Sequence, residues 1–110
     1  VLGTDGLIGK PNENPHPRAF GSTAHAYDLL VRKTKLLTSE AMVHKMTGQT
    51  ADFLGLSSKG RIADGADVDV LLIDLDRFCD TATYQNGNAL TQGIEHIFIS
   101  GREIALPNPE

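Results

Sequence analysis

The sequence has few of the features that mark membrane proteins and disulfide-rich secreted domains. Its 110 residues include one cysteine, Cys79, and no tryptophan, and aromatic residues make up only 5% of the chain. A lone cysteine cannot form an internal disulfide, so we expect a reducing, cytoplasmic location and interpret Cys79 as a small buried apolar residue. No apolar run approaches the length of a membrane span or a signal-peptide core, and we therefore predict no membrane partner.

The sequence also lacks a concentration of positive charge. Lys and Arg residues number 10 against 14 Asp and Glu residues, and the formal net charge is -4. The densest basic run, Arg32-Lys33 with Lys35, falls in a predicted helix, where we expect it to form a solvated face. Proteins that bind nucleic acids present a basic patch to the phosphates, so we predict no nucleic-acid partner.

Most short motifs that identify a catalytic site are missing as well. The chain contains no His-x-His, Cys-x-x-Cys or His-Glu-x-x-His, no glycine-rich phosphate loop and no Gly-x-Ser-x-Gly. His25 and His44 fall in predicted helices without a second histidine four residues on, and His96 falls in a predicted strand. A catalytic zinc normally needs three protein ligands, so this chain alone does not supply a complete metal site.

The residues that are present favour one modest core, with helices followed by strands. Hydrophobic residues make up 40% of the chain, which is typical of a globular protein. The patterns predict strands over 1–4, 61–63, 68–73, 94–99 and 102–106, helices over 22–37, 38–47 and 50–54, and a long loop over 5–21. This order favours an α+β fold or a join between two domains near residues 56–59.

Local signals add detail to these elements. Ser22 or Thr23 is expected to cap the first helix with its side-chain oxygen. The strand at 68–73 is apolar on both faces, so we expect it to be covered on both sides. Ser100-Gly101 is expected to form a two-residue hairpin turn.

Asp5 is the first candidate functional residue. It follows an apolar start and precedes Gly6, as a carboxylate does when it ends a strand and points into a site. Such an aspartate can bind a metal or take a proton from a bound water. The simpler alternative is an aspartate that caps an Asp-Gly turn, and the pattern by itself leaves both open.

Arg18 and His16 are the second group of candidates. Pro17 fixes the backbone beside Arg18, so that the guanidinium approaches from one direction. A guanidinium held in this way suits the bidentate capture of a carboxylate or phosphate, although a surface arginine remains an alternative. His16 can act as a ligand or an acid, or it can simply be a loop histidine bonded to the backbone.

Taken in order, several segments resemble the C-terminal part of the amidohydrolase superfamily, and within it the D-aminoacylase branch. The matching segments are Thr4-Asp5-Gly6, His16-Pro17-Arg18, Gly21-Ser22, Val43-His44-Lys45-Met46-Thr47, Phe53-Leu54-Gly55-Leu56, Gly60-Arg61-Ile62, Asp69-Val70-Leu71-Leu72-Ile73-Asp74 and residues 93–101. The resemblance implies part of a (β/α)₈ metal-dependent hydrolase barrel joined to part of a small β-sandwich. Residues 1–58 would form the end of the barrel, with strand eight, the catalytic loop and helices, and residues 59–110 the sandwich strands.

The resemblance also implies roles for the candidate residues in hydrolysing N-acyl-D-amino acids. Asp5 would contact the metal and carry the proton of the attacking water, and Arg18, with His16 beside it, would hold the α-carboxylate of the substrate. Zinc is the expected cofactor, because it lowers the pKa of bound water to about 7. The other metal ligands of the family lie upstream, so we expect the isolated chain to be inactive.

Two alternatives remain at this stage. The parent can be another amidohydrolase, such as a dihydroorotase-, hydantoinase- or deaminase-like enzyme, or the chain can be a non-catalytic β-rich binding module. The chain begins at Val1, without Met, in what we predict to be a strand, and we interpret this as the sign of a fragment. Because a fragment of a barrel exposes apolar surface, we also expect a homo-oligomer, a dimer or larger.

Overall fold

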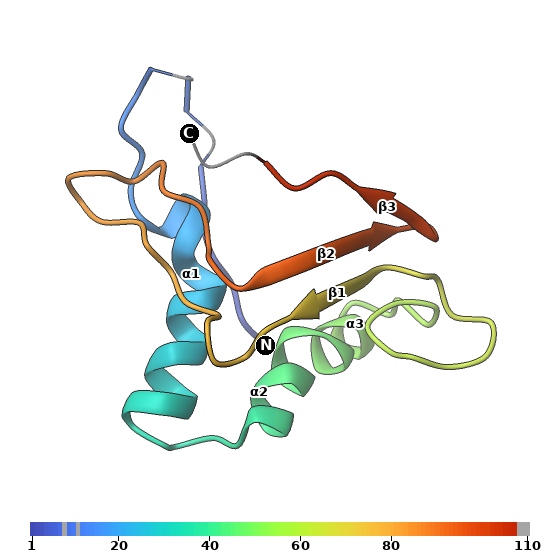
Figure 1. Cartoon of the computed structure of the whole chain (residues 1–110). Coiled ribbons are helices and arrows are strands. Elements are labelled where there is room, and N and C mark those ends of the chain that lie inside the picture. The colour runs from blue at the N-terminus through green and yellow to red at the C-terminus, as the bar shows by residue number, and fades with distance from the viewer. Residues whose placement is uncertain (8, 11, 108–110) are drawn as a thin grey trace.

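The computed structural model describes residues 1–7, 9–10 and 12–107. Helices precede strands, as the α+β prediction requires (Figure 1). The helices are α1 (Arg18–Tyr27), the π-helix η1 (Asp28–Lys33), α2 (Ser39–Met46) and α3 (Gly48–Phe53). The strands are β1 (Val70–Ile73), β2 (Ile94–Ile99) and β3 (Arg102–Ile104).

Helix α1 begins at Arg18 and not at Ser22, so the predicted cap at Ser22 or Thr23 is wrong. Pro17 occupies the cap position with a φ of -51°. Proline is well suited to a helix start, because its φ is already helical and its missing N–H has no partner to lose there. Ser22 lies inside the helix instead, where its hydroxyl donates to the carbonyl of Arg18 at 2.9 Å.

The predicted helix over 22–37 is not one regular α-helix. It passes from α1 directly into η1, and the amide of Thr34 donates to the carbonyl of Leu29 at 2.9 Å, five residues back. The π-helical turn places Arg32 across from the segment that follows β1, where its guanidinium donates to the carbonyls of Leu75 and Phe78. The expectation that Arg32 belongs to a solvated face is therefore wrong.

The strands form one antiparallel sheet in the order β1-β2-β3. Ser100 and Gly101 both have positive φ, at 51° and 77°, which is the geometry of the two-residue turn that the sequence predicts. The strand predicted over residues 61–63 does not form, and Ile62 is 94% exposed.

Two further strand predictions need correction. Residues 1–4 do not form a strand, because a strand needs a partner for its backbone N–H and C=O groups and the sheet lies elsewhere. Within 68–73, β1 is shorter than predicted, and Leu71 and Leu72 are about half exposed rather than covered on both faces.

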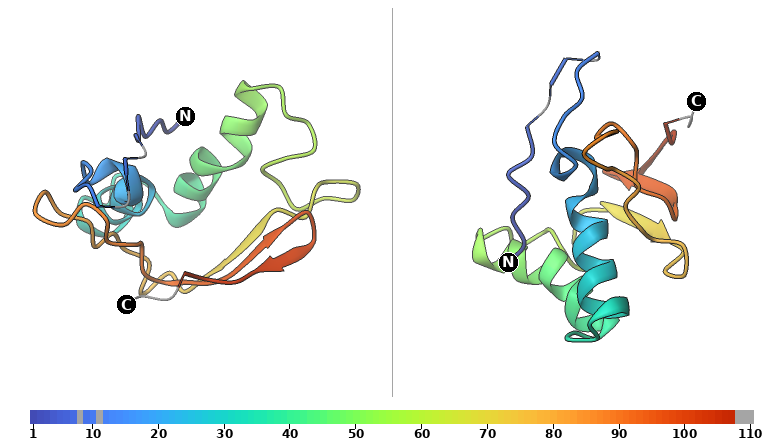
Figure 2. Two further views of the ribbon diagram at one scale, coloured as in Figure 1. Left: turned by 90° about the horizontal axis from the view of Figure 1, so that it is seen from above. Right: turned by 90° about the vertical axis from the view of Figure 1, so that its left-hand side faces the viewer.

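The core lies where the helices meet the segment between β1 and β2. Ala24, Tyr27 and Met42 come from the helices, and Phe78 inserts from the segment that joins the two strands. The rings of Tyr27 and Phe78 meet edge-on, with centroids 5.5 Å apart. Residues 75–92, which join β1 to β2, therefore leave the sheet and run along α1 (Figure 2). Within the described residues, no helix is both long enough and apolar enough to cross a membrane.

Candidate functional site

Asp5 and Arg18 lie together although 13 positions separate them in the sequence. A guanidinium nitrogen of Arg18 is 3.4 Å from the Asp5 carboxylate. The side chain of Arg18 is 39% exposed and that of Asp5 is 85% exposed, so water screens this ion pair. Arg18 Nε is buried and has no partner among the described residues. The guanidinium is thus near one carboxylate and is partly open to solvent.

The prediction that Asp5 ends a strand is wrong, because residues 1–7 form no strand. The φ of Asp5 is 49°, in the left-handed region, which aspartate tolerates better than most residues. Gly6 follows, and a Cβ there would touch the backbone at Ala19, in the first turn of α1. The chain after Asp5 therefore passes close to the start of α1, and this passage brings the carboxylate to Arg18.

His16 takes the simpler of its two predicted roles, as a histidine bonded to the backbone. Its Nδ1 accepts the backbone N–H of Arg18 at 3.1 Å. In this contact the backbone N–H is the donor and the imidazole nitrogen is the acceptor. His16 satisfies one of the free amides at the start of α1 and holds the backbone of Arg18 at that end of the helix.

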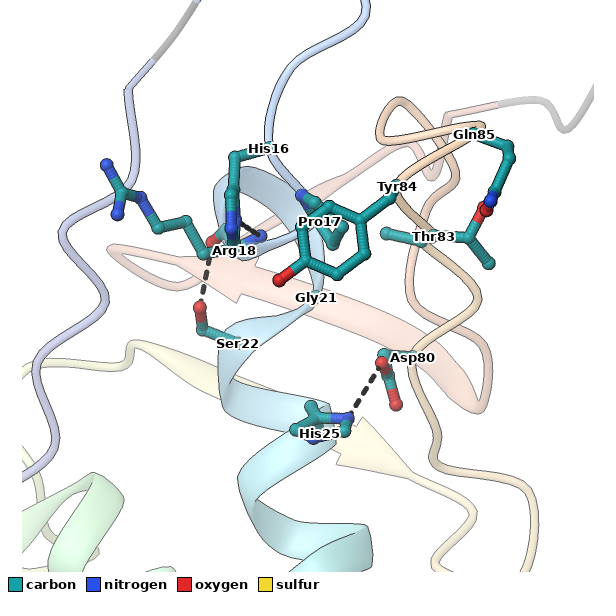
Figure 3. Close-up of a pocket in the computed structure, with 11 residues that line it drawn as sticks. His16, Pro17, Arg18, Gly21, Ser22, His25, Asp80, Thr83, Tyr84 and Gln85 are labelled. Carbon is teal, nitrogen blue, oxygen red and sulfur yellow. Dashed lines mark hydrogen bonds and ion pairs between the residues drawn. The ribbon is translucent and has the colours of Figure 1, made fainter.

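A cavity of about 460 Å³ lies beside this helix start (Figure 3). It is lined by His16, Pro17, Arg18, Gly21, Ser22 and His25 on one side and by Asp80, Ala82, Thr83, Tyr84 and Gln85 on the other. The side chain of Arg18 extends away from Tyr84, on the far side of His16 (Figure 3). Asp5 does not line the cavity.

The far wall of the cavity is a set of residues that sequence reasoning did not find. Asp80 Oδ2 lies 3.1 Å from Nδ1 of His25, and a Cβ on Gly21 would come within 3.1 Å of the Asp80 side chain. The ring of Tyr84 meets that of His16 edge-on, with centroids 5.1 Å apart. Residues 80–85 carry no helical or strand periodicity, so nothing local in the sequence marks them as neighbours of α1.

The described residues contain no group of three or more His, Cys, Asp or Glu side chains that could hold a metal ion. His25 and His96 instead pair with Asp80 and Glu103, the latter at 2.6 Å. Among the described residues, Asp5 is therefore not part of such a group.

Comparison with known proteins shows that the fold matches part of the D-aminoacylase amidohydrolases. No protein-family model matches the chain. A solved D-aminoacylase, described as defining a novel subset of amidohydrolases, superposes with a TM-score of 0.78 at 31% identity over 83% of this chain and 19% of its own. The N-acyl-D-glutamate deacylase of Bordetella bronchiseptica, in complex with zinc and a phosphonate mimic of the tetrahedral intermediate, gives 0.78 at 33% identity over 82% of this chain and 19% of its own.

Particular relatives define the branch of the amidohydrolases. The N-acyl-D-glutamate deacylase of Alcaligenes xylosoxydans xylosoxydans is 43% identical over 92% of this chain, and the N-acyl-D-aspartate deacylase of that organism is 36% identical over 94%. The chain belongs to the D-aminoacylase branch of the amidohydrolases. It spans only about a fifth, 20%, of the length of each of these two relatives.

Proposed function

We propose that this chain is the C-terminal part of a metal-dependent amidohydrolase that hydrolyses the amide bond of N-acyl-D-amino acids. The relatives that match nearly the whole chain are deacylases of this kind, which favours this function over other amidohydrolases and over a non-catalytic binding module. The observation that carries the proposal is the pairing of Asp5 with Arg18, because it brings together the two side chains such a reaction needs from this part of the enzyme.

Arg18 binds the α-carboxylate of the substrate in this proposal. Its guanidinium already lies beside a carboxylate, and the pairing with Asp5 is open to water, since the Arg18 side chain is 39% exposed. A substrate carboxylate can therefore pair with the outer edge of the guanidinium. His16 acts beside it by holding the backbone N–H of Arg18, so that the guanidinium approaches the substrate from a constant direction.

Asp5 is the proposed acid–base residue. Its carboxylate takes the proton of the attacking water and returns it to the leaving amine nitrogen, which has to be protonated before the C–N bond breaks. Its exposure in this chain leaves the carboxylate accessible to a substrate and to the remainder of the enzyme.

Zinc is the proposed cofactor of the whole enzyme, as in the zinc-bound N-acyl-D-glutamate deacylase. The residues of this chain do not fit a complete zinc site, since Asp5 stands without two further ligands among the described residues. Asp5 would contribute one carboxylate, and the histidine ligands would come from elsewhere in the parent. A bound zinc lowers the pKa of water and supplies the nucleophile at neutral pH.

We propose the same division into domains as the sequence suggested. Residues 1–58 would complete a (β/α)₈ barrel, and residues 59–110 would join a β-sandwich. Many apolar side chains are exposed, among them Leu36, Phe53 and Ile62 at 73%, 75% and 94%. Such surface favours association with other parts of the parent, or, for the isolated chain, with further copies.

The test compares paired substrates in the enzyme that contains this chain. We expect Arg18→Met to lower kcat/KM for an N-acyl-D-amino acid by about 100-fold or more, and to leave kcat/KM for the matching N-acyl amine, which has no carboxylate, nearly unchanged. Asp5→Asn should lower kcat for both substrates. Arg77→Met is the control, because Arg77 is exposed and makes no ion pair within the described residues.

Two results would overturn the proposal. One is an Arg18→Met enzyme that loses the same factor on both substrates, since Arg18 would then not bind the carboxylate. The other is turnover by the isolated 110-residue chain supplied with zinc, since the remaining metal ligands would then not be needed from elsewhere.

A further inference from the structure

The loop that leads into Arg18 is attached to a distant turn of the chain. Residues 13–18, here called the Arg18 loop, lie beside residues 83–88, here called the 83–88 turn (Figure 1). The side-chain amide of Asn14 makes two bonds across this boundary. Its Nδ2 donates to the carbonyl of Tyr84 at 2.9 Å, and its Oδ1 accepts the backbone N–H of Gly87 at 2.7 Å.

The two bonds use Asn14 in a way that few other side chains can match. An amide presents a donor and an acceptor at fixed spacing, and each here meets a backbone group of the opposite kind. Aspartate keeps the acceptor for Gly87 but sets an oxygen against the carbonyl of Tyr84. Alanine loses both bonds and leaves the amide of Gly87, which is buried, without its partner.

Gly87 brings the backbone of the turn against the backbone of the loop. A Cβ on Gly87 would overlap the carbonyl oxygen of Pro15, the residue before His16. The two nearest atoms are backbone atoms of Pro15, which cannot move aside as the end of a flexible side chain can. A methyl group at Gly87 would therefore push directly on the backbone of the Arg18 loop.

Two further contacts join the Arg18 loop to the 83–88 turn. Asn88 donates from Nδ2 to the carbonyl of Glu13 at 2.9 Å, and the rings of His16 and Tyr84 meet edge-on. The backbone of the Arg18 loop has little conformational freedom, because Pro15 and Pro17 fix their own φ angles. Fewer free backbone rotations therefore separate Asn14 from Arg18.

We propose that Asn14 and Gly87 are positioning residues for Arg18, so that the C-terminal half of this chain orients the residue that binds the substrate carboxylate. This rests on the proposed function of Arg18. Neither residue needs to touch the substrate: they act through Pro15, His16 and Pro17 on the direction of the guanidinium.

The experiment uses the enzyme that contains this chain, with the substrate pair described above. We expect Asn14→Ala and Gly87→Ala each to raise KM for the N-acyl-D-amino acid about ten-fold or more, with kcat changed less than about three-fold. KM for the N-acyl amine should stay the same. Asn14→Asp should raise KM for the N-acyl-D-amino acid by an intermediate factor. The double variant of Asn14→Ala and Gly87→Ala should raise it no more than the worse single variant, because both residues act through the same contact between the loop and the turn.

Asn12→Ala is the matched control. Asn12 is exposed, lies immediately before the Arg18 loop, and makes no side-chain hydrogen bond among the described residues. It should leave both KM values unchanged. Losses that are equal for the two substrates, or a double variant with the summed effect, would overturn the proposal, because they indicate general damage rather than misdirection of Arg18.

A second readout separates this proposal from the proposed function. In the 110-residue chain, exchange of the Gly87 amide hydrogen and the chemical shifts of Arg18 are followed by NMR. Asn14→Ala should speed the exchange at Gly87 and shift Arg18, whereas Asn12→Ala should do neither. If the wild-type enzyme shows no deacylase activity but these changes occur, the proposed function is wrong. The structural link from Asn14 and Gly87 to Arg18 is then still supported. If Arg18 does not shift, the positioning proposal fails whatever the activity.

Discussion

The Arg18 loop and the β2-β3 hairpin are two regions built by contacts of opposite range. In the hairpin, Ile99 faces Arg102 and Ile97 faces Ile104 across a two-residue turn, so its pairing partners lie close in the sequence. The Arg18 loop takes its partners from 70 to 75 positions away, through the side chains of Asn14 and Asn88. One region can form from its own residues, whereas the other requires the chain to fold back on itself.

This difference shows how the candidate site depends on the C-terminal half. Short-range pairing costs little loop entropy, and long-range pairing has to be supported by burial elsewhere. Phe78, in the segment that joins β1 to β2, supplies that burial. It is 3% exposed and packs against the helices. The site therefore depends on a core residue that is distant from it.

Replacing Phe78 with alanine should have the largest effect and should separate the two regions. We expect Phe78→Ala to cost about 3–5 kcal/mol of unfolding free energy, because a buried ring is removed and a cavity is left. Amide exchange at Gly87 should become fast, since residues 75–92 are no longer anchored to the helices. Denaturant unfolding and hydrogen exchange measure the two effects.

A milder variant keeps this prediction open to contradiction if Phe78→Ala does not fold. Phe78→Leu should still expose the Gly87 amide in part while the amides of β2 and β3 keep their protection. Ile62→Ala is the control, since Ile62 is 94% exposed, and it should change neither quantity. Equal loss of protection at Gly87 and in the hairpin would show that the regions are not separable.

The contrast between the regions also explains which features the sequence could predict. The strand over 94–99 forms as Ile94–Ile99, and the turn at Ser100-Gly101 forms as expected, because both depend on alternation and on residues that accept positive φ. Helix α2 starts where Thr38 can accept the N–H of Ala41, at 3.1 Å. These elements are determined by neighbours in the sequence.

Features that depend on distant partners were not predicted. The guanidinium of Arg32, in the π-helical turn η1, donates to the carbonyls of Leu75 and Phe78, which sequence periodicity does not connect to it. The start of α1 at Arg18 was also missed, although its cause is local, since Pro17 and the ring of His16 stand at that end. In the candidate site, Asp5, His16 and Arg18 were found through their residue types and the family resemblance. Asn14 and Tyr84 were not, because their roles come only from contact with each other across the fold.

A substitution in the hairpin turn should have a smaller and local effect. Gly101 has a φ of 77°, and only the Cβ of Val68, at 4.0 Å, lies near its Cβ position, so Gly101→Ala adds conformational strain with little steric overlap. We expect a cost of about 1–2 kcal/mol, with faster amide exchange in β2 and β3 and no change at Gly87. NMR-detected exchange on one sample measures all three sites.

Gly55→Ala is a matched control for that variant. Gly55 has a similar φ of 72° and nothing within 4 Å of its Cβ position, but it lies just after α3. The global cost should therefore be similar and the hairpin should stay protected. A Gly101→Ala chain in which Gly87 also loses protection would contradict the independence of the two regions.

The smallest effect concerns a side-chain contact that joins the hairpin turn to Asp69, next to Val68, whose carbonyl accepts the N–H of Gly101 at 3.0 Å. Asp69 Oδ1 accepts the backbone N–H of Ser100 at 2.9 Å, and its other oxygen pairs with Lys59. Lys59, and then the Ser100 N–H, hold the pKa of the Asp69 carboxyl below its usual 3.8, while Asp69 and then Asp67 raise the pKa of Lys59 above 10.5. Asp69 is thus stabilising in its charged form.

Asp69→Asn should therefore destabilise the chain in a pH-dependent way. A carboxyl whose pKa is lowered by folding contributes its full stability above 3.8 and loses it as the pH falls through the folded-state value below that. The Tm difference between wild type and Asp69→Asn should be constant at neutral pH, should shrink below pH 3.8, and should also shrink above the raised pKa of Lys59. Asp64→Asn, at an exposed turn residue with no ion pair among the described residues, should show no such dependence. A Tm difference that is unchanged in acid would contradict this prediction, because the charged form of Asp69 would then not stabilise the chain, and the turn would depend on backbone contacts such as that of Gly101 with Val68.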